Sequence, residues 1–227
     1  MIKVLLWDID GTLLDFHASE KYAMKDCFKA YDLGEFTDDM QECYAAINKK
    51  YWEALERGEL TKPQVLVGRF IEFFEHEGIV CSDVEGFNKM FQLSLGDHVY
   101  FNDDSDKLIQ TLKTKYKQYA VTNGTFTAQQ KKLETSKLKY MLDDVFISDL
   151  LGVEKPNIEF FDKVFETIGN YDKDEVLIIG DSLTSDIKGG NNAGILTCFY
   201  DPKKTNNVKG LKVDYHITNL QELLNIL

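Results

Sequence analysis

Short apolar runs that end in turn residues recur along the chain and predict buried β-strands. The first run, residues 4–7, has no polar alternation and stops at Asp8, which is typical of a strand covered on both faces. The other runs lie in the second half of the chain, at residues 118–122, 145–148, 176–180, 196–200 and 215–217. Helical stretches separate these later runs, and such alternation predicts a parallel sheet with helices on both faces.

Between residues 17 and 95 the pattern changes to apolar residues spaced three and four apart, which predicts amphipathic helices. Four helical segments fit this stretch, and three of them have clear starts, at Thr37, at Thr61 and at the capping box Ser82-Asp83-Val84-Glu85. Their aromatic stripes are typical of a small helical bundle with a core of its own.

The predicted bundle interrupts the sheet domain, because one strand precedes it and the others follow it. We therefore predict an α/β fold with a doubly wound parallel-sheet core, formed by residues 1–16 and 98–227. Residues 17–97 would form the inserted helical bundle. The chain would cross between the two parts near His17 and at residues 97–101.

Composition and charge narrow the range of partners. The chain has 227 residues, 44% of them hydrophobic and 28% charged, which are ordinary values for a globular protein. Its net charge of −12 would repel nucleic-acid backbones and anionic membranes, so we expect neither a nucleic-acid polymer nor a membrane as partner. A small phosphorylated substrate remains compatible with this charge, because a bound cation reverses the local field.

The cysteines and the amino terminus indicate a cytoplasmic protein. The four cysteines form no C-x-x-C pair, which favours reduced thiols over a disulfide framework. The amino-terminal apolar run is too short for a signal peptide, and no run approaches the roughly 20 apolar residues that span a bilayer.

Polar residues follow several predicted strands at the point where each strand ends. Asp8 and Asp10 come after the first strand, and Thr122 and Asn123 close the second. Asp181 follows the strong apolar run at residues 176–180. In a doubly wound sheet the carboxyl ends of the strands meet at one edge, where ligands bind.

Each candidate has an ordinary explanation when it is taken alone. Thr122-Asn123-Gly124 is typical of a plain turn, and Lys155, at loop distance after the third strand, of a solvated lysine before a helix. Asp181 and Asp186 fit the acids that many helices carry at their N-terminus. The ordered placement of all of them at strand ends favours a shared site.

The residue types at this edge suit a metal ion and a phosphate. Aspartates close together repel one another unless a cation neutralises them. Oxygen ligands without histidine or cysteine suit Mg²⁺, which is a hard ion. The Lys155 ammonium, the Thr122 hydroxyl and backbone amides near Gly124 would then face a dianion such as a phosphate.

With these motifs the chain resembles the haloacid dehalogenase superfamily of phosphotransferases. The resemblance covers essentially the whole chain and rests on four ordered motifs: Asp8-Ile9-Asp10-Gly11-Thr12, Thr122-Asn123-Gly124, Lys155-Pro156, and Gly180-Asp181 with Asp186. It implies a Rossmann-like core and identifies the inserted bundle with a helical cap that closes over the site. Trp7 stands where the family more usually has phenylalanine, which changes packing and not chemistry.

The resemblance also implies roles for individual residues. Asp8 would be the nucleophile that forms a phospho-aspartyl intermediate, and Asp10 the general acid and base. Asp186 would orient the lysine or a metal-bound water. Mg²⁺ would be held by the Asp8 carboxylate, the Asp10 backbone carbonyl and Asp181, and the phosphoryl group by Thr122, Asn123, Gly124 and Lys155.

Within the superfamily the chain is most similar to bacterial nucleotidases that act on pyrimidine and non-standard nucleoside monophosphates. This similarity rests on Asn48-Lys49, Trp52, Gly58 with Thr61, Gly68-Arg69-Phe70, Thr125 to Gln130 and the run Gly152-Val153-Glu154-Lys155-Pro156-Asn157. Trp52 and Phe70 could stack on a base or could belong to the core of the cap. Arg69 could be a solvated charge or could contact a base or a carboxylate.

Other activities stay open at this stage. A phosphatase for phosphoglycolate or sugar phosphates would use the same core with a different cap lining. A haloacid dehalogenase would use Asp8 on carbon, but members with that activity lack the second acid and the metal, so Asp10 and Asp181 disfavour it. A mutase would return the phosphate to the product, and a non-catalytic relative typically lacks the nucleophile or the lysine.

Overall fold

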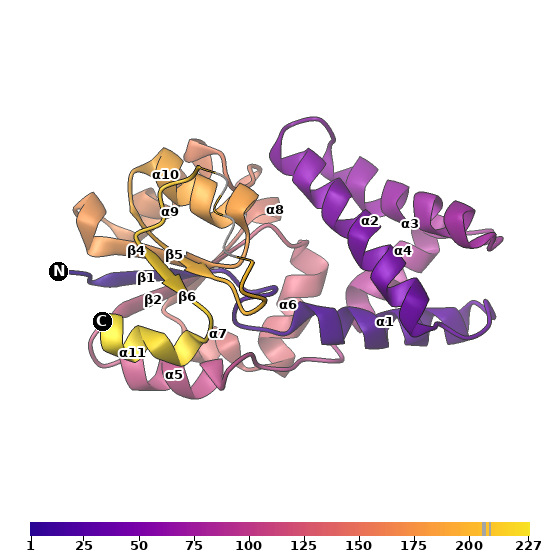
Figure 1. Cartoon of the computed structure of the whole chain (residues 1–227), viewed down its shortest axis with the longest axis horizontal. Helices are drawn as coiled ribbons and strands as arrows, with labels where there is room; N and C mark the ends of the chain where they lie inside the picture. The colour runs from indigo at the N-terminus through magenta and orange to yellow at the C-terminus, as the bar shows by residue number, and fades with distance from the viewer. Residues whose placement is uncertain (206–207, 209) are drawn as a thin grey trace.

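The sheet predicted from the apolar runs is present. The computed structural model describes residues 1–205, 208 and 210–227. It contains one six-stranded parallel sheet in the order β3-β2-β1-β4-β5-β6, so the first strand lies in the middle (Figure 1). The strands are β1 (Val4–Trp7), β2 (Lys117–Thr122), β3 (Asp144–Ile147), β4 (Val176–Gly180), β5 (Leu196–Tyr200) and β6 (Tyr215–Ile217). The predicted α/β class and all six strands are therefore confirmed.

The register of the central strands brings the predicted strand ends together. Trp7, the last residue of β1, pairs with Ala120 of β2 and with Ile179 of β4. Asp8 continues this alignment, because its backbone N–H donates to the Ile179 carbonyl at 2.9 Å. The residues after β1, β2 and β4 consequently share one edge of the sheet.

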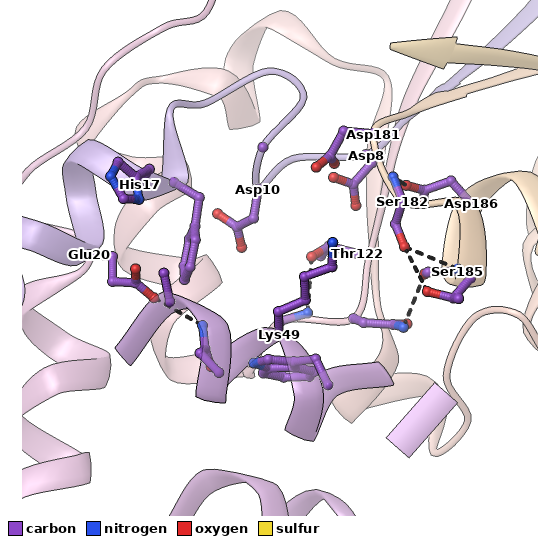
Figure 2. A pocket seen from close by; sticks show the side chains of 18 of the residues that line it. Asp8, Asp10, His17, Glu20, Lys49, Thr122, Asp181, Ser182, Ser185 and Asp186 are labelled. Atoms are coloured by element: carbon purple, nitrogen blue, oxygen red, sulfur yellow. Dashed lines mark hydrogen bonds between the residues drawn. The ribbon is translucent and has the colours of Figure 1, made fainter. Parts of the chain in front are cut away.

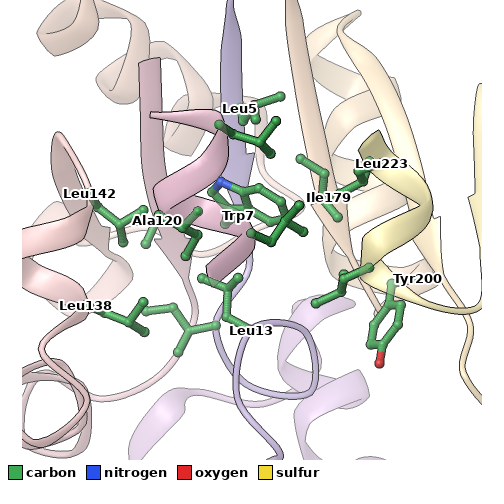
Figure 3. Close-up of a cluster of buried hydrophobic side chains, with 14 of the residues drawn as sticks. Leu5, Trp7, Leu13, Ala120, Leu138, Leu142, Ile179, Tyr200 and Leu223 are labelled. Atoms are coloured by element: carbon green, nitrogen blue, oxygen red, sulfur yellow. The ribbon is translucent and has the colours of Figure 1, made fainter. Parts of the chain in front are cut away.

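Helices cover both faces of the sheet, and alternate side chains of each strand enter two separate cores. Leu5 and Trp7 point into the core beneath α5 (Ser105–Leu112), α6 (Phe126–Thr135), α7 (Leu138–Met141) and α11 (Leu223–Ile226) (Figure 3). Val4 and Leu6 face α9 (Ile158–Ile168) and α10 (Lys188–Ala193) on the other side of the sheet. The Trp7 indole N–H donates to Gln118 Oε1 at 3.1 Å, which satisfies its polar atom inside the apolar core. A further short helix, α8 (Ser148–Leu151), directly follows β3.

The inserted stretch forms a bundle of four helices beside the sheet (Figure 1): α1 (Phe16–Ala30), α2 (Asp38–Glu56), α3 (Lys62–Glu77) and α4 (Val84–Ser94). Thr37 and Thr61 are the N-caps of α2 and α3, as predicted. The prediction for α4 is wrong by one residue. Asp83, not Ser82, caps it, because the Asp83 carboxylate accepts the Gly86 N–H at 2.8 Å.

The two connections between bundle and sheet run side by side. Leu14 and Phe101 form an antiparallel bridge, and the Asp15 N–H donates to the Tyr100 carbonyl at 2.9 Å. Paired connections of this kind give the bundle a short attachment to the sheet edge that carries Asp8. The position of the domain boundaries stays a prediction.

Two further expectations concern the cysteines and membranes. All four cysteines are free thiols, and Cys27 and Cys198 are buried. Within the described part of the chain, none of the helices is both long and apolar enough to traverse a bilayer.

Candidate active site

Lys155 connects several of the predicted site residues through its side chain. It precedes α9 and is 1% exposed. Its ammonium donates to Asp8 Oδ1 at 2.8 Å, to Asp186 Oδ1 at 2.6 Å and to the Val121 carbonyl at 2.7 Å. Burial alone would lower the pKa of Lys155, but Asp186 and Asp8 outweigh it and raise that pKa above its ordinary value. Lys155 is therefore a fixed cation that bridges the first and last motifs.

Asn123 holds the backbone of Lys155. Its amide N–H donates to the Lys155 carbonyl at 2.8 Å, and its Oδ1 accepts the Lys155 N–H at 2.8 Å. The Asn123 side chain is thus engaged with Lys155, and its predicted contact with a phosphoryl group stays a prediction.

The turn after β2 is built tightly around Thr122. The Gly124 N–H donates to the buried Thr122 hydroxyl at 3.0 Å, which closes the turn. A side chain at position 124 would collide with Gln129. Thr122 lies close to Asp8 and lines the cavity (Figure 2), so the structure brings the first two motifs together as the sequence predicted.

Asp8, Asp181 and Asp186 form a carboxylate cluster. They can each contribute an oxygen such that the three oxygens lie within 4.8 Å of one another. Burial raises the pKa of Asp8 well above its ordinary value; Asp186 and Asp181 add to this, and Lys155 opposes it. Burial, followed by repulsion from Asp186, raises the pKa of Asp181 to about 7. A cation beside Asp8 and Asp181 would relieve both effects.

Neighbouring backbone and side chains orient this cluster. The Thr12 hydroxyl donates to Asp181 Oδ1 at 3.1 Å, and Asp186 Oδ2 accepts the Ser182 N–H at 3.1 Å. Gly11 has φ +94°, and a Cβ there would meet the Asp181 carboxylate at 2.6 Å, so this close approach requires glycine. Lys155 and the Ser182 N–H thus occupy the two Asp186 oxygens, and the role of Asp186 in orienting the lysine or a metal-bound water stays a prediction. A π-helical turn (Leu183–Ile187), which periodicity did not predict, presents Asp186.

Asp10 is held by Lys132, which the sequence did not single out, and by Gln129, which belongs to the stretch Thr125 to Gln130 but was given no role of its own. Lys132 Nζ and Gln129 Nε2, one turn apart on α6, donate to its two carboxylate oxygens, each at 2.5 Å. Lys132 is only 2% exposed. Gln129 and Lys132 are three residues apart on the helix that follows the Thr122 turn, so they share one helix face. That spacing was the feature of the sequence that could have identified them as a pair.

A cavity of about 770 Å³ lies between this sheet edge and the bundle. Trp52 lines this cavity, so its side chain remains available to contact a ligand. Phe70 does not: it is 0% exposed and packs among Tyr44, Phe87 and Phe91 in the aromatic core of the bundle. The suggestion that Phe70 stacks on a base is therefore wrong.

The bundle side of the cavity carries a buried polar network. Arg69 is 1% exposed, so it is not a solvated charge, and its guanidinium donates to Asn48 Oδ1 at 2.7 Å. Asn48 in turn donates to Glu20 at 2.9 Å. Burial raises the pKa of Glu20 to about 8, although Arg69 opposes this. The sequence did not identify Glu20 as a residue of the site, because a single acid on an amphipathic helix has no pattern that separates it from a surface charge.

Comparison with known proteins gives a consistent picture. The family model of haloacid dehalogenase-like hydrolases matches residues 2–194. Pyrimidine 5′-nucleotidase PynA of Streptococcus pneumoniae is 34% identical, over 99% of this chain and 94% of its own length, and pyrimidine 5′-nucleotidase YjjG of Escherichia coli is 30% identical, over 98% and 96%.

A solved structure agrees with this match. The HAD-hydrolase YfnB from Bacillus subtilis is 36% identical in sequence to this chain, and its crystal structure, bound to magnesium, is described as revealing interdomain movement. It superposes with a TM-score of 0.92 over 100% of this chain and 98% of that protein. Family model, full-length relatives and superposition all agree with the four motifs found here at one sheet edge. The chain therefore belongs to the haloacid dehalogenase-like hydrolases.

Proposed function

We propose that this protein is a magnesium-dependent phosphatase that hydrolyses pyrimidine nucleoside 5′-monophosphates through a phospho-aspartyl intermediate. The observation that carries the proposal is the Asp8 carboxylate, fixed at 2.8 Å from the Lys155 ammonium and open to the cavity, with a second acid two residues later. A carboxylate beside a fixed cation and a cluster of acids suits attack on a phosphoryl group, whose charge must be balanced.

The proposed reaction has two steps. In the first, an Asp8 oxygen bonds to phosphorus, the bond from phosphorus to the ester oxygen breaks, and Asp10 gives that oxygen a proton. In the second, Asp10 takes a proton from water, whose oxygen attacks phosphorus and releases inorganic phosphate and free Asp8. Lys132 and Gln129 would hold the Asp10 carboxylate in place for both proton transfers.

The donor set at the sheet edge fits Mg²⁺. The Asp8 and Asp181 carboxylates and the Asp10 backbone carbonyl would hold the ion. Burial first, and then the neighbouring acids, raise the pKa values of Asp8 and Asp181, and a bound cation would offset both effects. When bound, Mg²⁺ supplies positive charge to the phosphoryl oxygens.

Removal of divalent ions should therefore stop the reaction. In excess EDTA we expect phosphate release to cease, and added Mg²⁺ should restore it. Mg²⁺ should also raise the unfolding temperature, because an ion that binds only the folded state stabilises it. The Asp181→Asn variant should lose most of this thermal shift. Full activity in excess EDTA would contradict the metal role.

The choice of substrate rests on the relatives and on the cavity. PynA and YjjG are named pyrimidine 5′-nucleotidases, and the cavity extends from Asp8 to Trp52 and the network of Asn48 and Arg69. An aromatic ring beside buried amide and guanidinium groups suits a flat base with polar edges. We propose that the bundle, residues 17–97, is the cap that encloses this part of the substrate.

Phosphate release from a substrate panel tests the proposal. With Mg²⁺ present, UMP, dUMP and dTMP should be hydrolysed better than AMP, GMP, phosphoglycolate and sugar phosphates. A preference for the small phosphates would keep the mechanism and reject the nucleotide assignment. Release of halide from a 2-haloacid, without phosphate release from any ester, would overturn both.

A further inference from the structure

Helix α2 directs a lysine from the bundle into the catalytic end of the cavity. One face of α2 lines the cavity with Ala45, Asn48, Lys49, Trp52, Glu53 and Glu56. In Figure 2 the Lys49 side chain extends from α2 toward Thr122 and the aspartates, away from its own helix. The long, flexible stem of lysine allows its ammonium to reach across the gap between bundle and sheet.

Lys49 differs from Lys155 and Lys132 in having no partner among the residues that the structure describes. Lys155 is paired with Asp8 and Asp186, and Lys132 with Asp10. Among the residues that the structure describes, Lys49 takes part in no hydrogen bond and no ion pair. Its neighbour Lys50 points elsewhere and pairs with Glu72 at 2.7 Å. Lys49 is exposed, so its ammonium, aimed at the reaction centre, is available to an anion that enters the cavity.

The charges at the site indicate what that anion is. The centre holds four carboxylates and the paired ammonium groups of two lysines: Asp8, Asp10, Asp181 and Asp186 against Lys132 and Lys155. A divalent cation would balance the excess of two acids, and a phosphate monoester would then add up to two negative charges. One further cation, close to the phosphoryl oxygens, reduces this new excess.

We infer that Lys49 binds a non-bridging oxygen of the transferred phosphoryl group. This inference rests on the proposed phosphatase function and adds to it a phosphate contact that comes from the bundle. Since Lys49 belongs to α2 and Lys155 to the sheet domain, a phosphoryl group held by both would join the two parts of the molecule. A ligand without that group would leave Lys49 unpaired.

Binding of inorganic phosphate tests the inference without assuming any ester substrate. Calorimetry in the presence of Mg²⁺ would compare the wild-type protein with Lys49→Met, Lys49→Arg and the control Lys50→Met. Loss of a charge-assisted hydrogen bond should weaken phosphate binding by about 10-fold or more in Lys49→Met. Lys49→Arg should keep most of the affinity, and Lys50→Met should match the wild type.

Kinetics then separates a phosphate contact from a contact with the leaving group. If Lys49 binds the phosphoryl group, Lys49→Met should lower kcat/KM by a similar factor for UMP and for p-nitrophenyl phosphate. Unchanged phosphate affinity in Lys49→Met, or a loss confined to UMP, would overturn the inference. If the wild type hydrolyses no ester, the proposed function fails, and the calorimetric comparison still decides the role of Lys49.

Discussion

Replacing Asp8 with asparagine is expected to abolish turnover and to leave the fold intact. An amide is a far poorer nucleophile than a carboxylate, and losses on the order of 10⁴-fold or more accompany removal of such a group. Asparagine has nearly the same shape, and Lys155 would keep its contacts with Asp186 and the Val121 carbonyl. Stability should therefore change much less than activity.

Phosphate release and thermal unfolding, measured on the same preparation, check this prediction. Asp162→Asn, which makes the same change at an exposed position of α9, is the matched control and should behave as the wild type. Near-normal turnover by Asp8→Asn would exclude Asp8 as nucleophile. A failure of Asp8→Asn to fold would show instead that the charge of Asp8 is needed to hold Lys155.

The sheet and the clustering of the main motifs were predictable from the sequence for one physical reason. Parallel strands buried on both faces appear as continuous apolar runs, and their carboxyl ends lie at one edge. The polar residues after those runs must therefore meet, as Asp8, Thr122 and Asp181 do.

The partners of those residues were not predictable in the same way. Helical periodicity divides a helix into an apolar and a polar face, but does not say which polar residues meet a cavity. Lys132 and Gln129 lie on α6, far in sequence from Asp10, and only tertiary packing brings them to it. Glu20 and Arg69 likewise meet through Asn48, which lies on a third helix.

The two aromatic candidates show the same limit. Trp52 and Phe70 both belong to amphipathic helices of the bundle, and their residue types suit a core as well as a base. Phe70 lies on the side of α3 that meets the other aromatic rings, whereas Trp52 lies on the cavity face of α2. The direction of each helix face depends on how the four helices pack, and spacing along the chain leaves that open.

Lys155→Met should cost both stability and activity. The Lys155 ammonium is buried with three acceptors, and removing it leaves Asp8 and Asp186 facing each other without a cation. Breaking a buried ion pair in this way typically costs about 3–5 kcal/mol. Since the pKa of Lys155 is raised on folding, its stabilisation is fully present below its ordinary value of 10.5 and is lost only at higher pH. The full effect is therefore expected at neutral pH.

Urea unfolding at neutral pH measures this loss, with Lys139→Met as the control. Lys139 is exposed and pairs with Glu134 at 3.2 Å, so its removal should cost no more than about 1 kcal/mol. Mg²⁺ should recover part of the stability of Lys155→Met, because it would offset the same acids. It should not restore turnover, because we propose that the ammonium also binds the phosphoryl group. An unfolding free energy equal to that of the wild type would contradict the role of Lys155 as the cation that holds Asp8 and Asp186 together.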